Sequence, residues 1–304
     1  MSDLKHYAIS FTGRRDNNQD ACTVLKLGNG TYFLAVADGM GGVHGGQVAS
    51  NLILQNAQNI LNEIDTEKLE ADSLKEILEN IFTSSQKVLY EKVQEQKDLA
   101  GMGTTLTAVL IKNDKFAWGN IGDSRTYLLR DKILKQLSVD HTYVEDYRQN
   151  NGDDIPDSII EQYSHYLTRA IDGGADEAEI YPSDKNYETL LEGDLLFLCS
   201  DGMITNKVHT DNETFTEYLL YISSGKEAAQ NLISYAFESG SKDNISVVIA
   251  EYGEFKREEK EIKKYQYPPK DYATSGFFSN KYFRMYSIII ILLLLIISAI
   301  LIFR

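Results

Sequence analysis

The chain has 304 residues, of which 43% are hydrophobic and 11% aromatic, enough for one large or two small folded domains. Acidic residues outnumber basic ones by 45 to 30, so the formal net charge is −15, which argues against nucleic-acid binding. The two cysteines, Cys22 and Cys199, lie in apolar strand-like runs without CxxC spacing. This excludes a disulfide framework and indicates a reducing compartment.

The first third of the chain predicts three strands followed by two helices. The N-terminus lacks the apolar stretch of a secretory signal peptide. The sequence Gly28-Asn29-Gly30 has the pattern of a hairpin turn between the second and third strands. A second helix is expected from Ser73, where Ser73-Leu74-Lys75-Glu76 has the pattern of a capping box. The strands are expected at 6–12, 21–27 and 32–37, and the first helix at 47–64.

The remaining two thirds predict more strands, with helices grouped near the end. Residues 140–180 are polar and are expected to be irregular, with a surface flap around 150–154. Grouped strands with few helices and no βαβ alternation predict an α+β layered sandwich. Strands are expected at 104–111, 115–121, 125–130, 132–137, 195–200 and 245–252, and helices at 213–223 and 227–238.

The C-terminal part differs in character from the rest. Residues 255–284 carry mixed charge and predict a solvated tether, which would reach up to ~80 Å if fully extended. Residues 285–303 contain the uncharged run SIIIILLLLIISAILIF, which predicts a transmembrane helix with an apolar length of ~26 Å. Lys281 and Arg284 place the preceding side in the cytoplasm. We therefore expect a single-pass anchor in the cell membrane with a cytoplasmic folded domain; a buried core helix in a soluble protein is the alternative.

Acidic residues recur at the ends of the predicted strands. Two apolar runs, FLAVADGMGG and LLFLCSDG, each end in Asp-Gly, at Asp38 and Asp201. Asp20 and Asp243 precede strands, and Asp123 lies in a Gly-Asp-Ser-Arg corner. Carboxylates that converge on one rim of a sandwich repel one another unless cations neutralise them. Oxygen ligands without His or Cys favour Mg²⁺ or Mn²⁺ over zinc, although any single Asp-Gly is also typical of a turn.

Seven short motifs, taken in order, make the chain resemble the metal-dependent type 2C Ser/Thr protein phosphatases, and the bacterial branch in particular. The resemblance covers about residues 5–252 and leaves out the tether and the apolar segment. The motifs are Arg15-Asp16-Asn17-Asn18-Gln19-Asp20, Asp38-Gly39-Met40-Gly41-Gly42, Gly101-Met102-Gly103-Thr104-Thr105, Gly122-Asp123-Ser124-Arg125, Leu167-Thr168-Arg169-Ala170, Ser200-Asp201-Gly202 and Lys242-Asp243-Asn244-Ile245.

This resemblance implies a four-layer α-β-β-α sandwich of two antiparallel sheets, with two Mn²⁺ or Mg²⁺ ions at one edge and a possible weaker third ion. Asp38 resembles the acid that bridges the two ions, and Gly39 the residue that contributes its carbonyl. Asp20 resembles the acid that holds a bound water, and Asp123 with Asp201 resembles the ligands of the third ion. The metal ligands that the resemblance implies are Asp20, Asp38, Gly39, Asp123, Asp201 and Asp243.

The implied activity is hydrolysis of phosphoserine and phosphothreonine in proteins by a metal-activated water, without a phosphoenzyme. Asp38 and Arg15 are the catalytic residues in this interpretation. Arg15 resembles the arginine that binds the substrate phosphate, for which its permanent charge and paired donors suit it. A surface ion pair is the alternative role for Arg15, and Arg14 is expected to be a bystander.

One position departs from the family pattern. Some members carry a histidine directly after Asp-Gly, proposed as the general acid, and this chain has Met40 there. His44 and His141 are the nearest histidines in the sequence, and a metal-bound water is the other candidate for the acid. The Thr168-Arg169 pair is expected to brace the flap at 140–165, whose residues we expect to affect substrate choice.

Two further hypotheses remain beside the membrane-tethered phosphatase. A tethered pseudophosphatase would bind phosphopeptides without turnover, but such a protein would be expected to lack some of the metal-binding acids, and all are present. A soluble enzyme would follow if the apolar segment were a core helix. The expected partners are phosphoserine and phosphothreonine proteins that a membrane Ser/Thr kinase modifies, and no nucleic acid.

Overall fold

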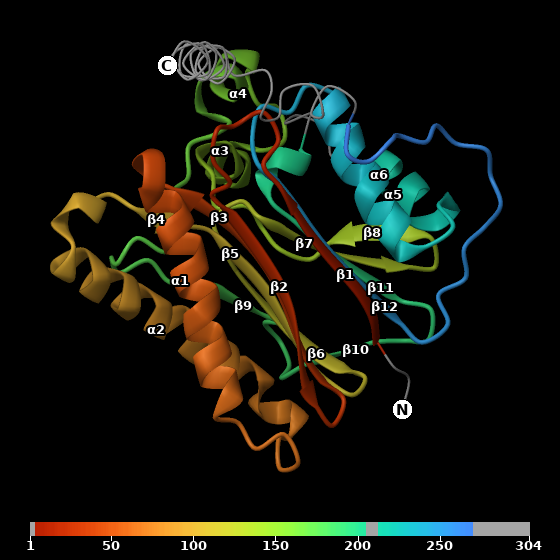
Figure 1. The fold of residues 1–304 in the computed structure, drawn as a ribbon, viewed down its shortest axis with the longest axis horizontal. Coiled ribbons are helices and arrows are strands. Elements are labelled where there is room, and N and C mark those ends of the chain that lie inside the picture. The colour runs from red at the N-terminus through yellow and green to blue at the C-terminus, as the bar shows by residue number, and fades with distance from the viewer. Residues whose placement is uncertain (1–3, 205–211, 270–304) are drawn as a thin grey trace, which may run out of the picture.

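The computed structural model describes residues 4–204 and 212–269 (Figure 1). Two antiparallel sheets pack face to face, and helices cover the outer face of each sheet. The order of layers is helix, sheet, sheet, helix, which confirms the expected α+β sandwich.

The first sheet has five strands and the second has seven. The order in the first sheet is β1 (Leu4–Phe11), β12 (Ile245–Tyr252), β11 (Leu195–Cys199), β7 (Arg125–Arg130) and β8 (Ile133–Gln136). The order in the second sheet is β10 (Glu188–Thr189), β6 (Lys115–Ile121), β5 (Leu106–Lys112), β3 (Thr31–Met40) and β2 (Asp20–Gly28), with β4 (Gly103–Thr104) paired to β3 and β9 (Glu179–Tyr181) paired to β6.

Two pairs of long helices form the outer layers. The pair α1 (Gly42–Asn62) and α2 (Leu74–Glu95) covers the seven-stranded sheet, and the pair α5 (Asn212–Tyr221) and α6 (Gly225–Glu238) covers the five-stranded sheet (Figure 1). Two shorter helices, α3 (Tyr143–Asn151) and α4 (Asp157–Tyr163), lie at one edge of the sandwich. Short 3-10 helices occupy Ala71–Ser73, Lys97–Leu99 and Asp201–Met203.

The central strands are apolar along their whole length because both of their faces are buried. In β3, Phe33 and Ala35 pack under α1 and α2, whereas Leu34 and Val36 point between the sheets. Alternation along a strand therefore places Asp38 on the face that points between the sheets, at the end of β3. This face leads directly to the edge where the candidate site lies.

Two local predictions from the sequence are wrong. Residues 140–180 are not irregular throughout, because they form α3, α4 and β9. Ser73 makes no capping hydrogen bond. Its φ of −87° and ψ of −5° place it in a helical turn that begins at Ala71, whereas a side-chain cap requires an extended backbone.

The described part of the predicted tether, residues 255–269, does not extend into solvent. Phe255, Ile262, Tyr265 and Tyr267 pack against the hydrophobic cluster to which α5 and α6 contribute. Across the described ranges, no helix combines the length and apolar character needed to cross a bilayer. The predicted transmembrane helix at 285–303 and the rest of the tether lie outside the described residues.

Candidate metal centre

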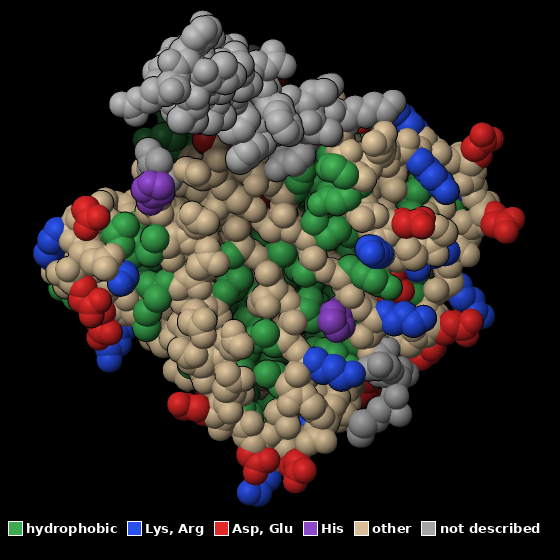
Figure 2. All heavy atoms as spheres, in the orientation of Figure 1, with side chains coloured by type: hydrophobic (Ala, Val, Ile, Leu, Met, Phe, Trp, Pro, Cys, Tyr) green, Lys and Arg blue, Asp and Glu red, His purple; other side chains and the backbone are tan. Residues whose placement is uncertain are grey.

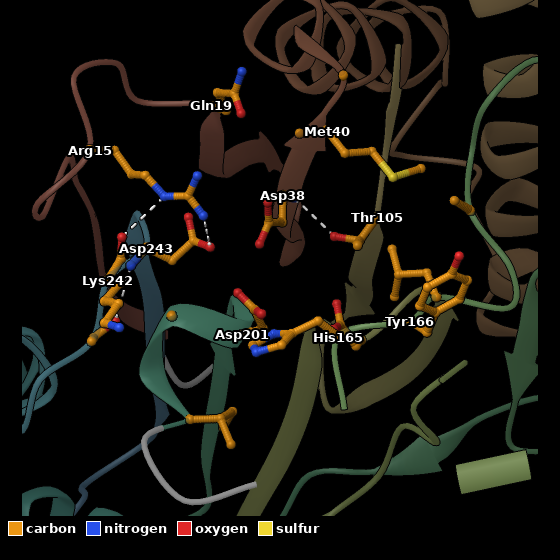
Figure 3. Close-up of a pocket in the computed structure, with 18 of the residues that line it drawn as sticks. Arg15, Gln19, Asp38, Met40, Thr105, His165, Tyr166, Asp201, Lys242 and Asp243 are labelled. Atoms are coloured by element: carbon orange, nitrogen blue, oxygen red, sulfur yellow. Dashed lines mark hydrogen bonds and ion pairs between the residues drawn. The ribbon is translucent and has the colours of Figure 1, made fainter. Parts of the chain in front are cut away.

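A cavity of about 1170 Å³ opens at the edge of the sandwich where β3 ends. Its walls come from the loop before β2, the turn after β11, the loop before β12 and the segment 165–172 (Figure 3). The structure therefore brings together residues that are far apart in the sequence. Six of the seven predicted site residues line it: Arg15, Asp38, Gly39, Asp123, Asp201 and Asp243.

Asp20, the seventh predicted site residue, lies behind the cavity wall. It is the direct register partner of Asp38 across the antiparallel pair of β2 and β3, and it is 5% exposed. The Ser200 hydroxyl donates a hydrogen bond of 2.7 Å to Asp20 Oδ2. Oδ1 of the same carboxyl is buried and has no hydrogen-bond partner within the described part of the chain. One oxygen of Asp20 is thus held and the other is left for a ligand.

The acids at this edge raise one another's proton affinity. Burial raises the pKa of Asp20 to about 7, and the charges of Asp201 and Asp243 add to this effect. Burial also raises the pKa of Asp38 well above its ordinary range, reinforced by Asp20, Asp201, Asp123 and Asp243. A divalent cation among these carboxyl groups would remove this repulsion, so the donor set fits a hard cation.

The carboxyl groups do not enclose a cation as they stand. In residues 4–204 and 212–269, no group of three or more His, Cys, Asp or Glu side chains is arranged to hold a metal ion. Mg²⁺-like ions keep several of their waters and bind proteins through one or two carboxylates. The cavity has room for such waters, and its acids offer only oxygen donors, which favours Mg²⁺ or Mn²⁺ over zinc.

The backbone of Asp38 is fixed by the Gly-Met-Gly-Thr-Thr motif. The Asp38 N–H donates to Thr105 Oγ1 at 2.9 Å, and the Asp38 carbonyl accepts from the Thr105 N–H at 2.8 Å and from the Thr104 hydroxyl at 2.9 Å. These bonds explain why two threonines follow the glycines in this motif. They leave the Asp38 carboxyl directed into the cavity (Figure 3).

Gly39 and Gly46 allow the end of β3 to touch the start of α1. A Cβ atom at Gly39 would lie 2.1 Å from the Gly46 carbonyl oxygen, and a Cβ at Gly46 would lie 2.5 Å from the Gly39 oxygen. Neither contact can be relieved by a side-chain movement, because both partners are backbone. The glycine-rich stretch after Asp38 is therefore required for close packing of backbone beside the cavity.

Arg15 contacts the loop that carries Asp243, and its guanidinium points toward Asp38 (Figure 3). Its Nη2 lies 2.7 Å from Asp243 Oδ2, and its Nε donates to the Lys242 carbonyl at 3.1 Å (Figure 3). The Arg15 side chain is 54% exposed, so it is accessible from the cavity. The surface ion pair that the sequence left open thus exists, and it lies within the site.

Asn244 and Gly13 hold the two loops of this wall together. The Asn244 side chain donates to the carbonyls of Thr12 and Asn17 at 2.7 and 2.9 Å, and it accepts from the Gln19 N–H at 2.7 Å. A Cβ at Gly13 would lie 2.2 Å from the Asp243 carbonyl oxygen. This explains the role of Asn244 in the Lys-Asp-Asn motif, which the sequence did not reveal.

The histidines near the site differ from the sequence-based expectation. His44 is exposed on α1 and does not line the cavity. His141 is fully buried, and its Nδ1 accepts from the Gly122 N–H at 3.2 Å, which fixes the turn that carries Asp123. His165 does line the cavity, together with Tyr166 (Figure 3). Sequence reasoning missed His165, although it lies two residues before the Leu167-Thr168-Arg169-Ala170 motif.

The Thr168-Arg169 pair contacts β9 and the first residues of the predicted flap at 140–165. Arg169 forms an ion pair of 2.8 Å with Glu179 on β9, and the Thr168 N–H donates to the His141 carbonyl at 2.9 Å. These contacts connect the cavity wall to β9 and to the loop that precedes α3.

The comparisons with known proteins agree with this geometry. The Protein phosphatase 2C family profile matches residues 12–236. The serine/threonine protein phosphatase PstP of Mycobacterium tuberculosis is 35% identical over 253 residues, which cover 82% of this chain and 45% of that protein. The serine/threonine phosphatase stp of Listeria monocytogenes is 30% identical over 237 residues, which cover 78% of this chain and 91% of that protein. The chain therefore spans less than half the length of the first relative and most of the second.

A solved structure also matches the fold. The catalytic domain of a serine threonine protein phosphatase PstP, in complex with two manganese ions, has a TM-score of 0.69 and 32% sequence identity. The match covers 84% of this chain and the whole of that domain. The two manganese ions belong to that structure.

Proposed function

The chain belongs to the protein phosphatase 2C family, and from this premise we propose that it is a metal-dependent protein serine/threonine phosphatase. One observation carries the proposal: half-buried Asp38 lies within the electrostatic reach of Asp20, Asp123, Asp201 and Asp243, at a cavity that Arg15 also lines. A cluster of acids suits divalent cations, and an arginine beside it suits a phosphate.

The cofactors that we propose are two Mn²⁺ or Mg²⁺ ions, with a weaker third ion possible in the cavity. Asp38, the Gly39 carbonyl, Asp201 and Asp243 would hold the two ions, and Asp123 with Asp201 would hold the third. Bound ions of this kind supply a nucleophilic water at neutral pH and neutralise charge on phosphoryl oxygens. Asp20 supports this site from behind Asp38, with one oxygen held by Ser200.

Arg15 orients the phosphate in this proposal. Its guanidinium lies beside Asp243, points toward Asp38 and offers planar N–H donors that remain charged at any physiological pH. A phosphate monoester dianion can replace part of its contact with Asp243, because the Arg15 side chain is about half exposed. The expected result is a phosphate held between Arg15 and the metal ions that the acids would bind, with no covalent bond to the chain.

We also propose that the chain is anchored in the cell membrane through residues 285–303, with its folded domain in the cytoplasm. The support is the uncharged apolar run at 287–303 and the basic residues Lys281 and Arg284 before it. The substrates that fit such an anchor are phosphoproteins modified by a membrane Ser/Thr kinase. Carbonate and detergent extraction of membranes tests the anchor: release of the full chain by carbonate alone would contradict it.

The activity is tested with the full chain in detergent and a phosphothreonine peptide. We expect release of inorganic phosphate in the presence of Mn²⁺, loss of release after EDTA, and recovery when Mn²⁺ is added in excess. A chain that binds the peptide but releases no phosphate with either Mn²⁺ or Mg²⁺ would contradict the enzyme proposal and favour a binding protein.

A further inference from the structure

Residues 254–269 form a strap that returns from the end of β12, passes over α5 and α6, and reaches the edge of the sandwich that carries the cavity. In Figure 1 the strap is the blue ribbon that leaves β12 and curves outside both helices. It contains no helix or strand, and side-chain and backbone contacts hold it along its length. The sequence of this stretch predicts a solvated tether, and the structure places it against the folded domain.

The first half of the strap is fixed to β12 and α5, in part by ion pairs. The Arg257 guanidinium lies 2.5 Å from Glu251 Oε1, and both side chains are largely buried. Lys260 pairs with Glu217 on α5 at 2.5 Å, and the Glu258 N–H donates to the Leu220 carbonyl at 3.0 Å. Figure 2 shows Lys, Arg, Asp and Glu side chains interspersed over this side of the molecule. None of the residues that make these contacts lines the cavity.

The second half of the strap is fixed to α6. The Tyr265 N–H donates to Asn231 Oδ1 at 2.7 Å, and the Ser234 hydroxyl donates to the Gln266 carbonyl at 3.0 Å. The Tyr265 ring also lies against Tyr218 and Tyr235, at centroid distances of 6.2 and 6.1 Å. Contacts with α6 therefore fix Tyr265 and Gln266, which directly precede Tyr267.

Tyr267 connects the strap to the wall of the cavity through a row of rings. Its ring centroid lies 6.0 Å from that of Phe11, the last residue of β1, and Phe11 lies 5.7 Å from Phe237 on α6 in an edge-to-face contact. The Arg14 guanidinium lies over the Phe237 ring, 3.8 Å from its centroid. Such contacts hold side chains in one relative arrangement.

Arg14 continues this connection to the residues that line the cavity. Its Nη1 donates to the carbonyls of Phe237 and Ser241, at 2.6 and 2.9 Å. Arg15 directly follows Arg14 in the chain, and Asp243 follows Ser241 by two residues. Arg15 Nη2 in turn lies 2.7 Å from Asp243 Oδ2. Arg14, which the sequence suggested was a bystander, thus joins the two loops that carry the proposed phosphate and metal residues.

We propose that Tyr267 is a positioning residue for this wall: the strap holds Phe11 and Phe237 in place, and through Arg14 it fixes the loops of Arg15 and Asp243. The inference rests on the proposed function of those two residues. It predicts that loss of the Tyr267 ring weakens binding of metal and of phosphorylated substrate, because both loops must be ordered again when the ligand binds.

The test uses the full chain in detergent with Tyr267→Ala, the ring-preserving Tyr267→Phe, and Lys260→Ala as a matched control in the same strap. Lys260 forms an exposed ion pair, so its loss is expected to have little effect. We expect Tyr267→Ala to raise both the Kd for Mn²⁺, measured by calorimetry with Mn²⁺ alone, and the KM for a phosphothreonine peptide by about three- to tenfold. The kcat at saturating metal and peptide is expected to change less than twofold, and Tyr267→Phe should restore both constants.

Unchanged Mn²⁺ affinity and unchanged KM in Tyr267→Ala would overturn the inference, as would an equal change in Lys260→Ala. A second variant covers the case in which Tyr267→Ala does not fold. Ser234→Ala removes only the hydroxyl that holds Gln266, and we expect it to shift both constants in the same direction by about twofold; no shift would overturn the inference. The calorimetric measurement of Mn²⁺ binding does not depend on turnover. If the wild-type chain shows no phosphatase activity, the proposed function is contradicted, and the comparison of Mn²⁺ affinities still tests the role of Tyr267.

Discussion

Asp20 and Asp38 stand directly opposite each other on β2 and β3, and the charge of Asp20 adds to the burial that raises the pKa of Asp38. Antiparallel register partners project to the same side of a sheet, so this pairing follows from the hairpin between the two strands. Two acids in register would destabilise a strand pair in water. Here Asp38 lines the cavity and Asp20 lies behind its wall, and in the proposed site a divalent cation would compensate both charges.

The first prediction concerns pH and the metal. The raised pKa of Asp20, about 7, means that the folded metal-free chain keeps a proton that the unfolded chain releases near pH 4. The stability contributed by this protonated carboxyl is present below pH 4 and is lost as the pH rises through 7. Bound Mn²⁺ replaces the proton, so we expect the Mn²⁺-induced rise in melting temperature to be larger at pH 8 than at pH 5.5.

Differential scanning fluorimetry in EDTA and in Mn²⁺ at both pH values measures this difference. Asp20→Asn is the matched control, because it removes the titrating group and should reduce the dependence on pH. An increase in melting temperature that is equal at the two pH values, or larger at pH 5.5, would contradict the prediction.

The second prediction concerns Arg15. Replacing it with alanine removes charge-assisted hydrogen bonds to the phosphate, so we expect kcat/KM for a phosphothreonine peptide to fall by roughly 10- to 100-fold. Arg15→Lys keeps the charge and loses the planar pair of donors, and it should recover only part of the loss. Lys87→Ala, which removes an exposed positive charge from α2, is the control and should leave kcat/KM unchanged. If Arg15→Ala retains full activity, Arg15 only forms a surface ion pair.

The third prediction concerns backbone packing beside Asp38. In Gly39→Ala the new methyl group would collide with the Gly46 carbonyl, and we expect a loss of about 1–3 kcal/mol in the free energy of unfolding or more, together with loss of Mn²⁺ binding. Urea denaturation measures the first effect. Gly174→Ala is a suitable comparison, because the nearest atom there is the end of the Asp172 side chain, which can move. Similar losses in the two variants would contradict the prediction that the clash with the Gly46 carbonyl oxygen causes the loss in Gly39→Ala.

The fourth prediction separates the two histidines that the sequence singled out. His44→Ala should leave turnover within about twofold of the wild type, because His44 lies outside the cavity. His141→Ala leaves the buried Gly122 N–H without its acceptor, and it should lower the free energy of unfolding by about 1–3 kcal/mol. Burial and the Arg169 charge lower the pKa of His141, which keeps Nδ1 available as an acceptor. A large loss of turnover in His44→Ala would instead support His44 as a proton donor.

Most of the architecture could be predicted from the sequence because its signals are local. The strands β6, β7 and β12 begin and end where their apolar runs and turns indicate. Central strands such as β3 are apolar on both faces, and an acid at the end of such a strand is conspicuous. The sequence therefore singles out all five acids that the structure places at this edge of the sandwich.

The parts that could not be predicted depend on contacts between distant segments. The strap at 254–269 has the charged composition of a solvated linker. Its charges are nevertheless paired with other elements, Arg257 with Glu251 on β12 and Lys260 with Glu217 on α5, and the sequence does not reveal these pairs. Its few apolar residues have no regular spacing that would reveal a buried face. His165 was missed for a similar reason, since only the folded position of the segment 165–172 brings it to the cavity.

The central claim is that Asp38 holds the divalent cations on which hydrolysis depends, and Asp38→Asn tests it most directly. This change keeps the size of the side chain and the backbone bonds to Thr104 and Thr105, and it removes one negative charge. Mn²⁺ binding by calorimetry and phosphate release from a phosphothreonine peptide are measured on the full chain. We expect the wild type to bind Mn²⁺ and release phosphate, and the folded variant to lose both; a variant that still turns over in Mn²⁺ at the wild-type rate would contradict the account.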